Sequence, residues 1–130
     1  MDIKLRYIFL CKNVEVDNSN SISCFDFFDI LKVNVVPSKI EESFYLVLGI
    51  DGVSEGKEVE FDISFTTPDH KERVIKKGAV KVSKSNISPV VYLFKMKNFP
   101  AKDLGTYYFN IYYKENLLSR HPLMIKKEEV

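Results

Sequence analysis

The chain has 130 residues, which is the length of one domain with a hydrophobic core of its own. Apolar residues make up 45% of it and aromatic residues 13%, with ten Phe and seven Tyr, which excludes an intrinsically disordered chain and favours β-strands. The formal net charge is +1, so overall charge points to neither a nucleic-acid-binding nor a membrane-binding protein.

The start of the chain lacks the pattern of a targeting or membrane-spanning segment. No apolar run approaches the roughly 18 residues that a spanning helix needs. The apolar stretch 7–11 is shorter than the apolar region of a secretory signal, which is about 7–15 residues long. We therefore expect a cytoplasmic protein without membrane contact, in which Cys11 and Cys24 are reduced thiols.

Two strands are expected in the first quarter of the chain. Residues 4–16 alternate, and the apolar set changes parity partway along: Ile3, Leu5, Tyr7, Phe9 and Cys11, then Val14 and Val16. That change predicts a β-bulge near Lys12 and Asn13. A polar turn at 17–20 follows. Residues 21–33 predict a second strand that is apolar on both faces, as central strands are.

The turn between these strands decides how the two cysteines lie. A two-residue turn at Asp17 and Asn18 would place Cys11 opposite Cys24, where a hairpin disulfide is geometrically feasible. A different loop length changes this register. The alternative is a pair of buried thiols that pack as small apolar side chains.

The middle of the chain contains the clearest strand. The stretch 30–43 includes Pro37 and predicts a loop that crosses between sheets, and residues 44–51 predict a third strand. Residues 58–66 alternate strictly, with one set of side chains facing inward: Val59, Phe61, Ile63 and Phe65. Residues 73–83 are richer in lysine, which is typical of an edge strand.

The last third predicts a strand at 90–96, a corner and a final hairpin. The turn of that hairpin is expected at Glu115 and Asn116, and its second strand at 117–125. Pro122 within that strand fits only an edge or a bulge, because proline has no N–H to donate.

The corner carries the most specific motif of the chain. Asp103, Gly105, Tyr107 and Phe109 form D-x-G-x-Y-x-F, which resembles the corner between two late strands of immunoglobulin-like sandwiches, where the last position is usually Cys. The resemblance implies that the Tyr107 hydroxyl bonds back to upstream backbone. Gly105 would allow the close approach and Asp103 would cap the turn amides. Phe109 and the absence of Trp exclude the usual disulfide packed on Trp. The alternative is an ordinary strand start after a turn.

The whole chain gives about eight strands with turns between them, which predicts an all-β, two-sheet antiparallel sandwich. Its order also resembles a group of short bacterial proteins of unassigned function. The shared features are an early Cys, an acidic or amide-rich turn, a Phe-Asp element and a late Gly-x-Tyr hairpin, here Cys11, Asp17–Asn20, Phe28-Asp29 and Gly105–Tyr107. This resemblance implies a β-sandwich and no known activity.

The neutral total conceals two charged blocks. Residues 13–70 hold twelve acids and three bases, a net of −9, and residues 71–102 hold nine bases and one acid, a net of +8. The basic block contains six candidate anion-binding residues: Lys76, Lys77, Lys81, Lys84, Lys95 and Lys97. The alternative is cross-strand pairing, because a hairpin centred on residues 69 and 70 places Asp62 opposite Lys77. The same register places Glu58 opposite Lys81.

Residue sets for known chemistry are not found. His70 and His121 are the two histidines, and neither has a Cys or His at zinc-ligand spacing. Phosphate-binding glycine loops, calcium loops and nucleophile-elbow motifs are absent from the sequence. We expect no cofactor and no catalysis. A deep pocket in which His70 or His121 contacts a carboxylate would instead support an enzyme.

Two functions are therefore expected ahead of catalysis. The first is a non-enzymatic interaction domain that binds protein, or a second copy of itself, through a sheet face or edge, with Tyr108 and Tyr112 as interface residues. The second is a binder of an anionic ligand, nucleic acid or nucleotide, which uses the Lys76–Lys97 block and one of these tyrosines.

Overall fold

The computed structural model describes residues 3–19, 21–53, 58–81 and 90–129, and this part of the chain forms eleven β-strands. The strands are β1 (Lys4–Val16), β2 (Ile22–Phe27), β3 (Ile30–Val33), β4 (Ser38–Ile40), β5 (Phe44–Asp51), β6 (Glu58–Thr66), β7 (Glu72–Lys81), β8 (Val90–Met96), β9 (Phe99–Ala101), β10 (Gly105–Tyr113) and β11 (Asn116–Lys127). Within these ranges there is no helix with the length and apolarity to cross a bilayer.

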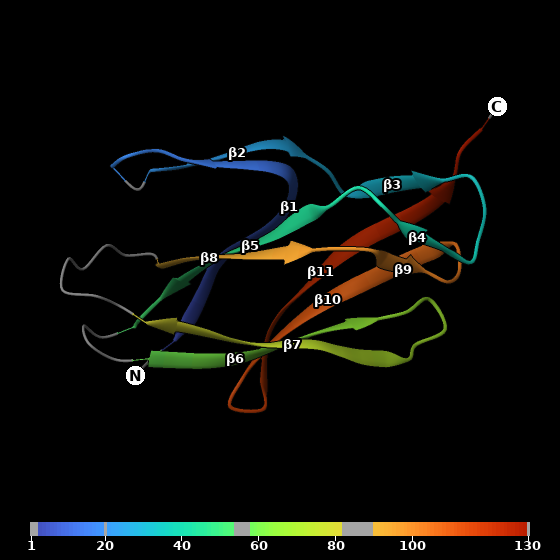
Figure 1. Cartoon of the computed structure of the whole chain (residues 1–130). Helices are drawn as coiled ribbons and strands as arrows, with labels where there is room; N and C mark the ends of the chain where they lie inside the picture. The colour runs from blue at the N-terminus through green and yellow to red at the C-terminus, as the bar shows by residue number, and fades with distance from the viewer. Residues whose placement is uncertain (1–2, 20, 54–57, 82–89, 130) are drawn as a thin grey trace.

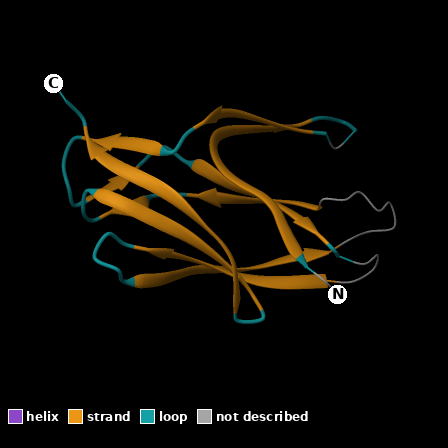
Figure 2. Ribbon diagram, turned by 180° about the vertical axis from the view of Figure 1, so that it is seen from behind, coloured by secondary structure: helices purple, strands orange, loops and turns teal. Residues whose placement is uncertain are grey.

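The strands form two main layers, as Figures 1 and 2 show from opposite sides. One sheet has four strands in the order β2-β1-β5-β8, and the other has five in the order β3-β11-β10-β6-β7. Strands β4 and β9 form a small two-stranded sheet of their own. All pairings are antiparallel except that of β11 with β3. The predicted all-β antiparallel sandwich is confirmed, with eleven strands instead of about eight.

The core lies between the inner faces of the two sheets. On β6 the side chains of Val59, Phe61, Ile63 and Phe65 are buried, which confirms the inward face predicted from the alternation of residues 58–66. Phe99 of β9 lies at the centre of an aromatic cluster, with its ring centroid 5.6 Å from those of Tyr107 and Phe109 and 5.9 Å from that of Phe44. Edge-to-face and tilted contacts of this kind stabilise a core beyond the area that they bury.

The expected second strand at 21–33 is wrong. The chain leaves the four-stranded sheet after Phe27 and enters the five-stranded sheet at Ile30, where β3 pairs in parallel with β11. Phe28 at the crossing packs edge-to-face on Phe44 of the core. A segment that is apolar on both faces is therefore two short strands in different sheets, of which only β3 places side chains, Leu31 and Val33, in the core.

The expected bulge near Lys12 and Asn13 is also wrong. The register of β1 shifts instead between Leu5 and Tyr7, next to β5, and it stays constant along β2. Because one extra residue turns the following side chains to the other face, Leu5 faces the core whereas Tyr7 faces outward.

The last hairpin turns one residue earlier than expected. Tyr113 pairs with Asn116, which leaves Lys114 and Glu115 as a two-residue loop with φ of 46° and 67°. Positive φ values at both loop residues are typical of a type I′ turn, whose twist matches that of the two strands it joins. Pro122 lies opposite Tyr108 and before Met124, where the pairing with β3 begins, so its missing N–H costs no ladder bond to β3.

The predicted corner is confirmed at Tyr107, whose side chain has no exposed surface. Its hydroxyl donates to the Asp103 carbonyl at 2.9 Å and accepts from the Asp103 amide at 3.0 Å. Gly105 has a φ of 129°, and a Cβ there would lie 3.1 Å from the Pro68 Cβ. Asp103 therefore engages the corner through its main chain, and Gly105 permits the close approach to the 67–70 turn.

Replacement of Tyr107 by Phe is expected to lower the free energy of unfolding by about 1–3 kcal/mol, because both polar groups of Asp103 lose a buried partner. Urea denaturation measures the change. The matched control is Tyr108→Phe on the same strand, for which we expect a change within about 0.5 kcal/mol. Equal effects of the two substitutions would contradict the anchoring role of Tyr107.

Candidate functional site

The candidate site is the outer face of the four-stranded sheet, which points away from the core. Beyond its bulge, β1 alternates between the two sides: Ile8 and Leu10 pack in the core, and Tyr7, Phe9 and Cys11 point outward. The neighbouring strands add Val47 of β5 to this outer side. The outer side of the sheet is thus apolar where a solvent-facing sheet is usually polar.

The β1–β2 hairpin curves over part of this face. Its turn is fixed by Asp17, whose Oδ1 accepts from the Ser19 amide at 2.8 Å and from the Ser21 amide at 3.0 Å. The hydrogen bond from the Ser19 hydroxyl, followed by those from the Ser21 and Ser19 amides, holds the pKa of Asp17 below its ordinary value. Figure 1 shows β1 bending in its middle before β2 returns. As a result Ile22 of β2 and Val91 of β8 line one hollow, although these strands are opposite edges of the sheet.

This hollow has a volume of about 380 Å³. It is lined by aromatic, aliphatic and thiol side chains: Tyr7, Phe9, Ile22, Cys24, Phe27, Val47 and Val91. We call the cavity that these seven residues line the hairpin hollow. Its size suits one or two apolar side chains of a partner, and its lining carries no acid, base or amide.

Aromatic rings form one side of the hairpin hollow. The rings of Tyr7 and Phe9 stack with centroids 5.7 Å apart, and Phe9 meets Phe27 edge-on at 4.9 Å. The Tyr7 ring occupies the space that a Cβ at Gly49 would need, so glycine is required there. Phe27 is nevertheless 67% exposed, which is unusual for a side chain of this size.

The two thiols of the chain meet at this site. Cys11 pairs with Phe27 and Cys24 pairs with Val14, so the two cysteines are not opposite each other as the two-residue turn would require. Both are free, with Cys11 fully buried and Cys24 half-buried. Burial, followed by the neighbouring Cys24, raises the pKa of Cys11 to about 11. Cys11 is therefore a protonated, apolar-like thiol near neutral pH, as the alternative interpretation held.

The predicted interface tyrosines lie on the opposite face of the molecule. Tyr108 and Tyr112 are half-buried on the outer side of β10, in the five-stranded sheet. Burial raises the pKa of Tyr112, and its hydrogen bond to Glu72 raises it further. Between them lie covered or partly covered polar side chains: Asn110, Ser64 and Thr66 are joined by hydrogen bonds.

The candidate anion-binding lysines are divided between the two sheets. Lys76, Lys77 and Lys81 belong to β7, the predicted edge strand, and their Cα partners on β6 are Ile63, Asp62 and Glu58. The predicted register of the two acid–lysine pairs is thus confirmed. Lys95 lies on β8 of the other sheet, with its Nζ 5.9 Å from the centre of the Tyr45 ring, and Lys97 is exposed just beyond that strand. Lys84 lies outside the described residues.

His121 meets a carboxylate, but not in a deep pocket. Its Nε2 is buried, lacks a hydrogen-bond partner and lies 3.6 Å from Asp29 Oδ1. Burial lowers the pKa of His121, and Asp29 opposes this shift in part. The nearest hollow is lined by Asp29 and by Phe9, Leu10, Phe27, Phe28 and Ile30, and His121 is not among its lining residues. His70 is exposed in the 67–70 turn.

Sequence reasoning missed the hairpin hollow because it assigned Tyr7 and Phe9 to the face of Leu5. The bulge that separates them has no proline, glycine or change of parity to reveal it. A weaker signal was present, since residues 7–11 are apolar at both parities, as a strand covered on both faces would be.

The thiol geometry predicts selective alkylation. With iodoacetamide at pH 7.5 and native protein, we expect Cys24 to react and Cys11 to stay unmodified, because only Cys24 reaches solvent and Cys11 is protonated. Peptide mass spectrometry reads both sites, and unfolding in urea should make both reactive. Native modification of Cys11 at the rate of Cys24 would contradict the structure.

The buried His121 predicts a pH-dependent stability. Since its pKa is lowered in the folded state, stability is lost as pH falls below about 6.5 towards the folded value, by about 1.4 kcal/mol per unit of lowering. We expect His121→Gln to remove this loss between pH 7.5 and 5.5, measured by urea midpoints, and Asp29→Asn to enlarge it. The matched control is His70→Gln, which changes the exposed histidine of the 67–70 turn.

Comparisons with known proteins agree with this architecture. The structure is similar to that of an immunoglobulin-like protein from Pseudomonas aeruginosa, with a TM-score of 0.53, 13% sequence identity, and coverage of 97% of this chain and 98% of that one. This likeness supports the fold, which is immunoglobulin-like as the corner motif implied. The comparison with curated proteins gives no match. The model of a family of unknown function, DUF6941, matches residues 6–126, and the chain therefore belongs to that family.

Proposed function

We propose that this protein is a non-enzymatic, protein-binding domain that docks its partner in the hairpin hollow. The observation that carries the proposal is the contrast between the two outer faces of the sandwich. The outer side of the five-stranded sheet carries hydrogen-bonded polar groups such as Asn110 and Ser64, both of which are largely covered. The four-stranded sheet presents aromatic and aliphatic side chains on its outer side, among them Phe27 and Ile22 of β2, which are 67% and 37% exposed.

The hairpin hollow suits a protein partner better than a polar small molecule. Binding sites for metabolites contain a few polar groups that fix orientation, and the described lining has no charged or amide side chain. Central, apolar and aromatic patches are instead the parts of protein interfaces that contribute most binding free energy. A partner that inserts one large apolar side chain against Phe27 and Val91 would exclude water from both surfaces.

The proposal also assigns the protein to a reducing compartment, the cytoplasm. Cys24 is half-buried in the hairpin hollow and is unpaired, with the Cys11 thiol beside it. In an oxidising compartment two neighbouring thiols would be prone to pair. Reduced thiols keep the hollow apolar and leave strands β1 and β2 without a covalent crosslink between Cys11 and Cys24.

Anion binding by the basic block has weaker support than protein binding. Two of its three lysines on β7, Lys77 and Lys81, have acids of β6 as register partners, which supports cross-strand pairing. The block from Lys76 to Lys97 therefore stays a prediction from sequence.

A crosslinker at position 27 tests the docking proposal. We expect p-benzoylphenylalanine at Phe27, in the source organism, to give one discrete protein adduct, either a partner or a second copy of the chain. After purification of that complex, Phe27→Ser should weaken it at least about tenfold, a loss of about 1.4 kcal/mol. The matched control is Leu117→Ser, because Leu117 is 48% exposed at the distant β10–β11 hairpin. A monomer that yields no adduct from position 27 would refute the proposal.

A further inference from the structure

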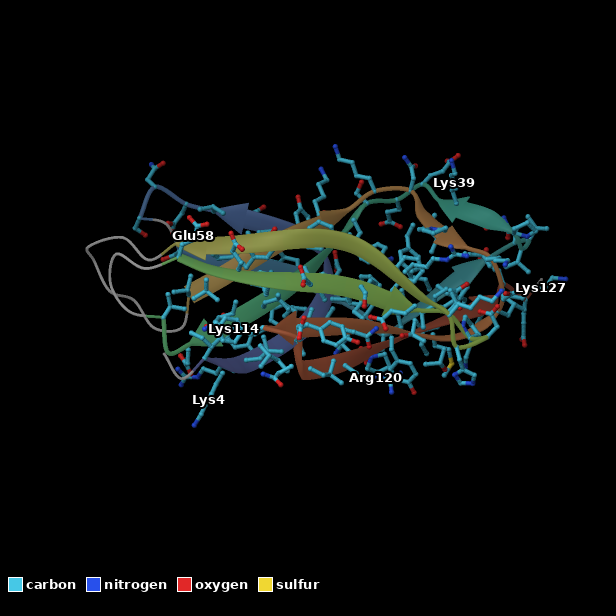
Figure 3. The ribbon with its side chains drawn as sticks, turned by 90° about the horizontal axis from the view of Figure 1, so that it is seen from below. Lys4, Lys39, Glu58, Lys114, Arg120 and Lys127 are labelled. Carbon is cyan, nitrogen blue, oxygen red and sulfur yellow. The ribbon has the colours of Figure 1, made fainter. Side chains whose placement is uncertain are left out.

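The outer face of the five-stranded sheet contains an ordered chain of hydrogen bonds that ends at an arginine. Arg120 Nε donates to Asn110 Oδ1 at 3.2 Å, and Asn110 Nδ2 donates to Ser64 Oγ at 3.1 Å. Ser64 Oγ in turn donates to Glu72 Oε1 at 2.6 Å, and Thr66 Oγ1 accepts a second bond from Asn110 at 2.9 Å. Figure 3 labels Arg120 on β11.

The direction of this chain is fixed by its two ends. A guanidinium has donors and no acceptor, so Asn110 must turn its carbonyl oxygen towards Arg120 and its amide towards Ser64. The Glu72 carboxylate only accepts, so the Ser64 hydroxyl must donate to it. Asn110 and Ser64 are each 2% exposed, and buried groups that are fully bonded in this way are rigid.

A second contact holds the guanidinium itself. The Cζ atom of Arg120 lies 4.2 Å from the centroid of the Tyr108 ring, which is the distance of a cation stacked on an aromatic face. One face of the guanidinium plane is thus covered and its Nε is committed to Asn110. The remaining four N–H donors on the two terminal nitrogens are not used by any hydrogen bond or ion pair with the described residues.

We propose that Arg120, stacked on Tyr108 and tied to Asn110, is a binding site for a carboxylate group. Two terminal N–H groups in one plane match the two oxygens of a carboxylate. The Tyr108 ring and the Asn110 bond fix the guanidinium before binding, so little side-chain entropy is lost when the carboxylate arrives. This site lies on the face opposite the hairpin hollow and does not rest on the function proposed above.

The surroundings favour a carboxylate over a phosphate. Glu72 hydrogen-bonds to Ser64 at the other end of the chain of bonds, and Asp62 is the register partner of Tyr112 on the same face. These acids oppose a dianion more strongly than a monoanion. A single negative charge is therefore the better complement to Arg120.

The test is a titration of the folded protein followed by NMR at the arginine Nε–H and asparagine side-chain signals. The probes are sodium acetate and sodium phosphate, with sodium chloride added to hold the ionic strength constant. We expect acetate to shift the Arg120 Nε–H and the Asn110 amide saturably, with a Kd in the range of about 10–100 mM. Phosphate should bind at least about threefold more weakly.

Two variants separate the site from general anion effects. Arg120→Lys and Tyr108→Leu should each weaken acetate binding at least about fivefold, because the first removes the planar fork and the second the stacking surface. The matched control is Arg73→Lys, an exposed arginine on β7, which should leave the titration unchanged. Linear shifts of equal size with acetate and chloride would overturn the site. Tighter binding of phosphate than of acetate would overturn the carboxylate assignment. Undiminished acetate binding in both variants would overturn the role of Arg120.

Discussion

The two bonds between the Tyr107 hydroxyl and the Asp103 backbone are the constraint on which the late half of the sandwich depends. Strand β8 belongs to the four-stranded sheet and β10 to the five-stranded sheet, so the chain must change layers between them. Tyr107 fixes that change because its ring is fully buried against Phe99 while its hydroxyl satisfies both main-chain groups of one corner residue. A polar atom is thereby brought into the core without loss of hydrogen bonding.

The early half of the chain changes layers at Phe28, which packs on Phe44 of the core and whose amide donates to the Leu10 carbonyl. One extra residue between Leu5 and Tyr7 turns Tyr7 and Phe9 to the outer face, where they line the hairpin hollow, and leaves Ile8 and Leu10 to pack in the core. The crossing near Phe28 then sends the chain from one sheet to the other within two residues. Both features are local changes of backbone direction with large effects on which side chains meet solvent.

These differences explain what the sequence could predict. The strands at 44–51, 58–66 and 90–96 and the Tyr107 corner follow from alternation and from a motif in which glycine and tyrosine have fixed roles, so local chemistry was sufficient. The outward face of Tyr7 depends on a bulge whose position is decided by pairing with β5, and pairing is not a local property. The hydrogen bonds of Asn110 are equally non-local, because their partners Ser64 and Thr66 are more than forty residues away in the chain.

The two outer faces of the sandwich differ in a way that folding alone does not require. The core between the sheets is complete without Phe27, whose side chain adds to no buried cluster and is exposed to water at a cost in solubility. On the other face, Asn110 and Ser64 are buried polar groups that need every one of their bonds, where aliphatic side chains would pack at lower risk. Each face therefore carries groups that are unfavourable for an isolated sandwich. On one face an apolar side chain, Phe27, is exposed to water, and on the other the polar side chains of Asn110 and Ser64 are buried. The two binding surfaces that we propose, the hairpin hollow and the Arg120 site, would account for both features.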